Sequence, residues 1–187
     1  IALLDACATT KNLPEGKELN TGQKKLQVEN ESKTETGKEA MNEVRGALAK
    51  APNNSLFGSS TMRHPFAFGL WIYNGFVNSD SGLGKWIFKR FAAKPLYIST
   101  VNPELRSRVA TNLLRDYGYF NGSVGYEIIP NERNVRKAKI QFTANMRNLY
   151  FLDSIMYRRF TPEAMELIND TRSRTYLHNG YQFCVIN

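Results

Sequence analysis

The sequence predicts an α+β fold in which helices pack on one small sheet. Two observations carry this prediction: an apolar stripe at helical spacing between residues 102 and 118, and two alternating apolar segments directly after it. A third is a short alternating segment at 25–29, followed by a second amphipathic stretch at about 38–50. A helix packed next to a hairpin is a scaffold rather than a catalytic centre.

The best-defined element is the helix that follows Asn102. The Asn102 side chain can cap it, and Pro103 stands in the first turn, where a missing amide costs nothing. Gly118 is expected to end this helix in a structural turn formed by Gly118, Tyr119 and Phe120. The predicted apolar stripe consists of Leu105, Val109, Ala110, Leu113, Leu114 and Tyr117.

Two predicted strands form a hairpin after this turn. In the first, Val124, Tyr126 and Ile128 alternate with other residues, and 130–134 reads as a turn. The second strand alternates again and carries polar residues on its other face. Its apolar positions are Ala138, Ile140, Phe142 and Ala144, and its polar ones are Lys137, Lys139, Gln141 and Thr143.

Around this centre the chain divides into three parts. Residues 1–22 are predicted to be a polar tether, and residues 23–148 one domain with an aromatic-rich helical insertion at 52–98. Residues 149–187 read as an incomplete second unit, beginning with a strand at 149–157 and a helix capped by Thr161. Within the domain, the strand at 25–29 turns two side chains inward and the helix at 38–50 three: Leu26, Val28, Met41, Val44 and Leu48.

The insertion combines aromatic and basic residues. A short helix can place Leu83, Trp86, Ile87 and Phe91 on one face, with Lys85, Lys89, Arg90 and Lys94 around it. Such a stripe most often packs into its own protein. It can also lie on a membrane or bind a partner, with Trp71, Trp86, Lys85 and Lys89 as the contact surface, or stack on single-stranded nucleic acid. We expect the core arrangement, and we do not expect nucleic acid as a partner.

Composition limits the class of protein. The chain has 187 residues, 42% of them hydrophobic, and a formal net charge of +8. It is therefore long enough for one real core, and its charge favours anionic partners or a solvated basic surface. No window reaches the roughly 20 apolar residues of a membrane-spanning helix.

We find no sign of an enzyme. Cys184 and His178 could be drawn as a nucleophile and a base, but no third group that would orient them is visible. His64 stands in a predicted loop, and Gly82-Leu83-Gly84-Lys85 lacks the spacing of a phosphate-binding loop. No metal or other cofactor is implied, because the cysteines and histidines are few and far apart.

Together these residues resemble a known family. The segment Leu113-Leu114-Arg115-Asp116-Tyr117-Gly118-Tyr119-Phe120, the hairpin, and Tyr150-Phe151-Leu152-Asp153-Ser154-Ile155 resemble polypeptide-transport-associated (POTRA) domains of outer-membrane protein assembly factors of the BamA/TamA type. The resemblance covers residues 24–180. It implies a binding module on the periplasmic face of the bacterial outer membrane. Its partners would be outer-membrane protein precursors or other assembly proteins, bound by strand addition at 25–29 or 122–129.

The first residues resemble the start of a bacterial lipoprotein. An apolar run and a small residue precede Cys7, as in a lipobox, and residues 7–16 resemble the lipoprotein start found in some branches of the same family. This resemblance implies that Cys7 is acylated and tethers the domain. The alternative is a frayed terminus with an incidental cysteine.

Overall fold

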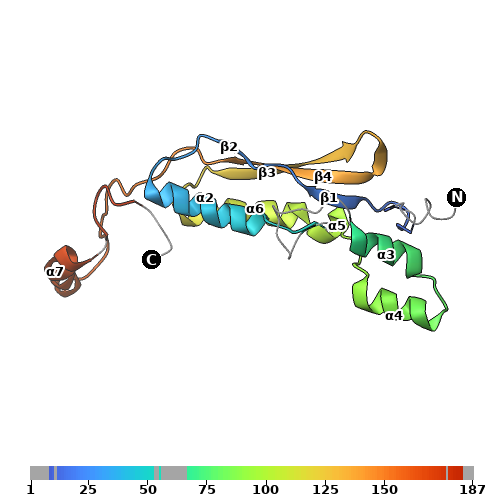
Figure 1. Ribbon diagram of the computed structural model, residues 1–187. Coiled ribbons are helices and arrows are strands. Elements are labelled where there is room, and N and C mark those ends of the chain that lie inside the picture. The colour runs from blue at the N-terminus through green and yellow to red at the C-terminus, as the bar shows by residue number, and fades with distance from the viewer. Residues whose placement is uncertain (1–8, 11, 53–54, 56–66, 176, 183–187) are drawn as a thin grey trace.

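The computed structural model describes residues 9–10, 12–52, 55, 67–175 and 177–182. It has a mixed α and β fold, as the sequence predicts, with a small sheet whose one face is covered by helices (Figure 1). The predictions for Cys7, His64 and Cys184 concern positions outside the described residues.

The sheet is built around β4 (Asn134–Asn145). Along one side of β4 run β1 (Leu19–Gln23) and β2 (Gln27–Glu29), both parallel to it. Along the other side runs β3 (Ser123–Asn131), antiparallel, with Tyr126 opposite Phe142. The last strand of the domain is therefore its central strand.

Two long helices lie against one face of this sheet, α2 (Glu35–Leu48) and α6 (Pro103–Asp116), as Figure 1 shows. Between them in the chain come α3 (Phe68–Phe76), α4 (Gly82–Phe91) and α5 (Ile98–Val101). After the hairpin follow α7 (Pro162–Thr171) and the 3-10 helix η1 (Arg172–Arg174).

The core lies between the sheet and the two long helices. The alternating residues of β4 predicted to face inward are all nearly inaccessible, and so are the apolar residues of α2: Ala138, Ile140, Phe142, Ala144, Met41, Val44 and Leu48. Apolar residues recur every second position in the strand and about every 3.6 positions in the helix, because the inward face of β4 packs against the apolar stripe of α2. Ala110 and Leu114 complete the core from α6.

The ends of α6 follow the predicted chemistry. The Asn102 side chain accepts a hydrogen bond from the Leu105 N–H at 3.2 Å, and Pro103 is the first helical residue. Gly118 has a φ of 87°, a left-handed conformation that ends the helix and turns Tyr119 into the core. Phe120 packs edge-on against Tyr150, with ring centroids 5.5 Å apart.

The predicted stripe of α6 was partly wrong. Leu105 and Val109 are 55% and 44% exposed, and the buried side instead contains Ser107. The buried stripe runs through Pro103, Ser107, Ala110 and Leu114. At roughly 100° per residue, its centre lies about 130° from Val109 and about 170° from Leu105. The packing against β3 selects this side, because Ser107 and Thr111 bond to that strand.

Two strand boundaries also differ from the prediction. β1 begins at Leu19, inside the residues expected to be tether, and Leu19 is buried. The strand predicted at 149–157 was wrong, since its described residues form only a single bridge, from Phe151 to Gln182. A strand exists only where a neighbour satisfies its main-chain groups, and among the described residues only 180–182 run alongside this segment, at Phe151 and Leu152.

Two glycines of α2 provide a matched test of the core. A Cβ on Gly37 would lie 2.5 Å from the Ser32 Cβ and 2.9 Å from the Tyr119 hydroxyl, whereas one on Gly46 would meet nothing within 4 Å. We predict that Gly37→Ala lowers the free energy of unfolding by about 1–3 kcal/mol through overpacking. Gly46→Ala should raise it by up to about 1 kcal/mol through helix propensity. Urea denaturation measures both, and equal effects of the two variants would contradict this packing.

The turn at Gly118 has a similar pair. Gly118→Val should cost about 2 kcal/mol or more, because a β-branched residue is strained at a positive φ. Gly125→Val in β3 is the control, because a Cβ at this position would meet no atom within 4 Å and valine favours the strand conformation. Thermal melts that move equally for both variants would exclude the proposed turn.

Candidate functional site

The main-chain groups that another strand could reach lie at the edges of the sheet, and those along β1 are covered. On the outer side of β1, the Asn20 N–H donates to the Leu96 carbonyl at 2.7 Å. The Ile98 N–H donates to the Glu18 carbonyl at 3.0 Å, so the segment before α5 runs along this strand. β2 is only three residues long. This side of the sheet therefore offers little room for another strand.

The opposite edge, β3, is covered only at its start. The Val124 N–H donates to the Thr111 hydroxyl of α6 at 2.9 Å, and the Ser107 hydroxyl donates to the Val124 carbonyl. Both main-chain groups of Val124 therefore point away from β4. Orientation alternates along an antiparallel strand, so the main-chain groups of Tyr126 and Ile128 point outward as well. Pro130, the next such residue, has no N–H to offer.

The outer groups of Tyr126 and Ile128 form the open part of this edge. Within the part of the chain that the structure describes, no hydrogen bond joins them to another segment. Their side chains share the helix-facing side with Val124, yet they are 41% and 37% exposed. Exposure arises because α6 begins beside the middle of β3 and leaves the rest of the strand uncovered. We call Gly125 to Ile129 the open edge.

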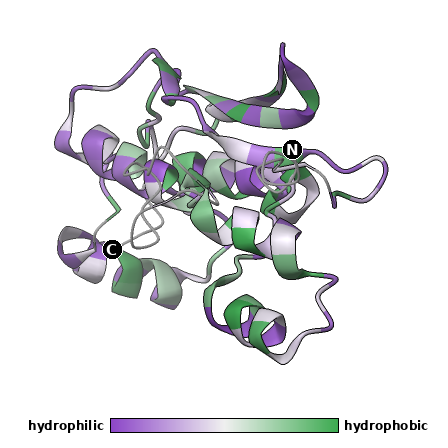
Figure 2. Cartoon of the chain, turned by 45° about the vertical axis from the view of Figure 1, so that its right-hand side comes forward, coloured by the Kyte–Doolittle hydropathy of each residue, from purple (hydrophilic) through white to green (hydrophobic). Residues whose placement is uncertain are grey.

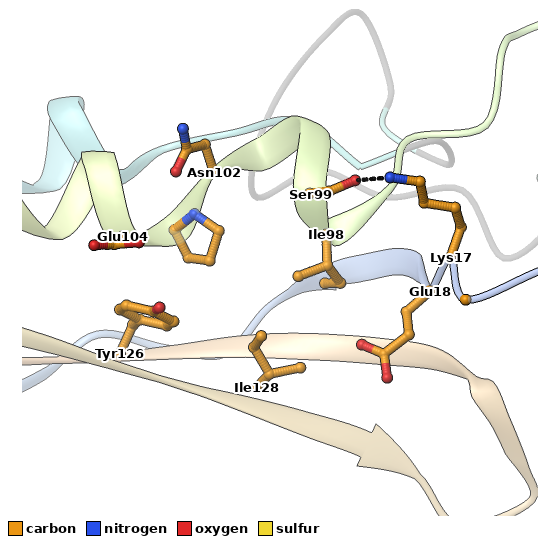
Figure 3. Close-up of a pocket in the computed structure, with 10 residues that line it drawn as sticks. Lys17, Glu18, Ile98, Ser99, Asn102, Glu104, Tyr126 and Ile128 are labelled. Atoms are coloured by element: carbon orange, nitrogen blue, oxygen red, sulfur yellow. Dashed lines mark hydrogen bonds between the residues drawn. The ribbon is translucent and has the colours of Figure 1, made fainter.

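A groove of about 330 Å³ lies beside the open edge. Figure 3 shows Tyr126 and Ile128 pointing from the strand toward the segment that contains Ile98, which begins α5, and Asn102, which caps α6. The segment before β1 completes the wall of the groove, and there the Lys17 ammonium donates to the Ser99 hydroxyl at 3.4 Å. A second hollow of about 190 Å³ shares Asn102 and Glu104 with it and continues along α6.

The groove is apolar at its floor and mixed in charge at its rim. The floor is formed by Ile98, Pro103, Tyr126 and Ile128. On the rim, Glu104 pairs with Arg108 at 2.5 Å, and Lys17 stands next to Glu18. This arrangement does not select strongly for charge. It can receive alternate apolar side chains of an extended chain lying beside β3.

Among the described residues, Tyr97 and Glu163 have shifted pKa values. Burial, with a smaller contribution from Tyr73, raises the pKa of Tyr97 beside β1. Hydrogen bonds from its own main chain and from Thr161 lower the pKa of Glu163 at the start of α7. Both are explained by local structure. Among the described residues, no group of three or more histidine, cysteine, aspartate or glutamate side chains could hold a metal ion. His178 stacks edge-on near Tyr181 instead.

The predicted contact residues of the insertion do not all lie on one surface. Trp86, Lys85 and Lys89 are exposed on α4, whereas Trp71 is half-buried on α3 and packs edge-on against Phe68 at 5.5 Å. The expected burial of the α4 stripe was therefore wrong for Leu83, Trp86 and Phe91, which are 53–70% exposed. Over the residues described, no helix is both long and apolar enough to cross a bilayer.

Comparisons with protein-family models, with curated proteins and with solved structures found no match.

Sequence reasoning missed the two residues that define the site, Ser107 and Thr111. Serine and threonine are common in helices, so their presence alone is no signal. Their separation by four residues places both hydroxyls on one face of α6. A small polar pair at that spacing on the sheet-facing side of a helix is the signal that could have pointed to a strand end held by side chains.

The open edge predicts a pattern of amide hydrogen exchange. The amides of Gly125, Glu127 and Ile129 belong to the β3–β4 ladder and should exchange slowly, whereas those of Tyr126 and Ile128 should exchange fast. Val124 should be slow in the parent chain and faster in Thr111→Val, which removes its acceptor. Slow exchange at Tyr126 and Ile128 would show that this edge is covered.

Proposed function

We propose that this chain is a POTRA-like binding module that holds extended polypeptides by strand addition to β3. The observation that carries the proposal is the open edge, where two successive outward-facing residues have no partner among the described residues. An extended chain could bond to Tyr126 and Ile128 and continue the sheet. Its alternate side chains would enter the groove beside α6.

The groove suits many clients rather than one. Main-chain hydrogen bonds do not depend on sequence, and a shallow apolar floor adds only loose selectivity. This matches the partner class that we infer, unfolded outer-membrane protein precursors or other proteins of an assembly machine. No catalytic step is part of the proposal, and it needs no cofactor.

The order of elements supports the same assignment. A strand, a helix, a helix and two strands follow one another as β2, α2, α6, β3 and β4, with α3 to α5 inserted between the helices. This is the order on which the resemblance to POTRA domains rests. The described residues of 149–182 contribute α7, η1 and one bridge, so a second unit remains part of the proposal only.

We place the module at the periplasmic face of the outer membrane, tethered by acylated Cys7. Part of the predicted tether is held on the domain. Arg136 in β4 donates to the carbonyls of Thr10, Leu13 and Pro14 at 3.2, 2.5 and 3.3 Å. Thr10 is three residues from Cys7, so a lipid there would hold the domain within about 10 Å of its anchor.

Peptide binding tests the function. The probe is a ten-residue peptide, roughly the length of a barrel strand, that alternates aliphatic and polar residues. Addition of this peptide should shift the amide resonances of Tyr126 and Ile128. The same peptide with alternate amides N-methylated should bind at least tenfold more weakly, because it cannot donate to the edge.

Two proline variants separate binding from folding. Tyr126→Pro removes an outward N–H and should abolish peptide binding with a modest loss of stability, since the preceding Gly125 tolerates the ring. Glu127→Pro removes a ladder hydrogen bond to β4 and should unfold the hairpin. If folded Tyr126→Pro binds the peptide as the parent does, or if N-methylation has no effect, strand addition at β3 is excluded.

A further inference from the structure

The α3–α4 hairpin leaves one face of α4 in solvent. The inward face of α4 is fixed by Phe88, whose ring lies 5.5 Å from that of Tyr73 on α3, and by Gly84. A Cβ on Gly84 would lie 2.0 Å from the Ser79 hydroxyl, so α4 packs closely at Gly84 and cannot turn another face inward. Figure 1 shows the hairpin projecting away from the sheet and its two long helices.

The exposed face of α4 combines large apolar and basic side chains. At about 100° per residue, Trp86 lies between Lys89 on one side and Arg90 with Leu83 on the other. Trp86 is 60% exposed and Leu83 is 70% exposed. Figure 2 shows hydrophobic and hydrophilic residues together on α4, and mainly hydrophobic or neutral ones on α3. An aromatic ring flanked by cations is the composition of helices that lie at the level of lipid headgroups.

Charge separates this hairpin from the rest of the surface. Residues 67–95 contain four basic residues, Lys85, Lys89, Arg90 and Lys94, and a single acidic one, Asp80. Asp80 lies 3.9 Å from Lys85 and is fully exposed, so its charge offsets that of Lys85 only weakly. Both helices lack acidic residues altogether. The partner that complements this face is therefore anionic.

The N-terminal segment joins the domain at the same hairpin. The Asn12 side chain donates to the Asn74 carbonyl of α3 at 3.0 Å, and Leu13 packs in a cluster with Leu19 and Leu70. Figure 1 shows α3 and α4 at the end of the molecule where β1 begins. Asn12 and Leu13 therefore connect the segment before β1 to this hairpin.

We propose that the exposed face of α4 is a contact site for an anionic lipid surface. Leu83 and Trp86 would enter the headgroup layer, and Lys89, Arg90 and Lys85 would bind lipid phosphates. Single-stranded nucleic acid is the weaker fit, because stacking needs aromatic planes in series and the most exposed large apolar side chain of this face is the aliphatic Leu83. The contact is independent of peptide binding at β3.

Vesicle flotation tests this contact in the full chain carrying Cys7→Ser, so that no acyl group contributes. We expect flotation with vesicles of phosphatidylcholine mixed with phosphatidylglycerol and none with phosphatidylcholine alone. Lys89→Gln should weaken binding about fivefold, and Leu83→Ser with Trp86→Ser should abolish it. The matched controls, Lys33→Gln and Leu167→Ser, change equally exposed residues elsewhere and should bind as the parent does.

Fluorescence gives a second measurement. The chain has two tryptophans, so Trp71→Phe leaves Trp86 as the reporter, and its emission should shift to the blue on anionic vesicles. Absence of flotation, unchanged flotation in the α4 variants, or binding of single-stranded DNA but not vesicles would each overturn the proposal. Peptide binding at β3 should be the same in all these variants, which keeps a failure here distinct from a failure of the proposed function.

Discussion

The structure depends on the pairing of β4 with strands on both of its sides. One face of β4 is fully buried under α2 and α6, and this face brings together elements more than 90 residues apart, such as Met41 and Phe142. Because β4 is central, β1 and β2 on one side and β3 on the other form the edges of the sheet. The outer main-chain groups of each edge are either covered or open to another strand. What covers each edge therefore decides where another polypeptide can bind.

The two edges are covered in different ways. The chain itself runs along β1, whereas side chains of α6 satisfy only the first part of β3. α6 thus covers β3 at Val124. Because α6 begins beside the middle of β3, the open edge and its groove stay uncovered. The basic hairpin of α3 and α4 lies outside this arrangement. Polypeptide binding and lipid contact would then use separate parts of one small domain.

Local patterns predicted the parts of the fold that local chemistry determines. The capped helix, the Gly118 turn and the alternation of β4 were confirmed, because each depends on neighbours in the chain. β1 was missed since its Leu-Asn-Thr-Gly-Gln sequence has no apolar alternation. Contacts distant in sequence hold it, including the Thr21 hydroxyl bound to the Ala138 carbonyl. Exposure of Leu105 and Trp86 likewise follows from where helices dock, which periodicity alone does not encode. The sequence predicted that the open edge is either the strand at 25–29 or the one at 122–129. The hydrogen bonds of Ser107 and Thr111 to Val124 show where along β3 the covered main chain ends.

The most direct measurement is an isotope-edited NMR experiment on the labelled chain with an unlabelled alternating peptide. If the sheet accepts a further strand at β3, cross-strand contacts should join peptide Hα atoms to Gly125 and Glu127, in one continuous register. Contacts confined to side chains of the groove, or contacts along β1 or β2 instead, would contradict the account.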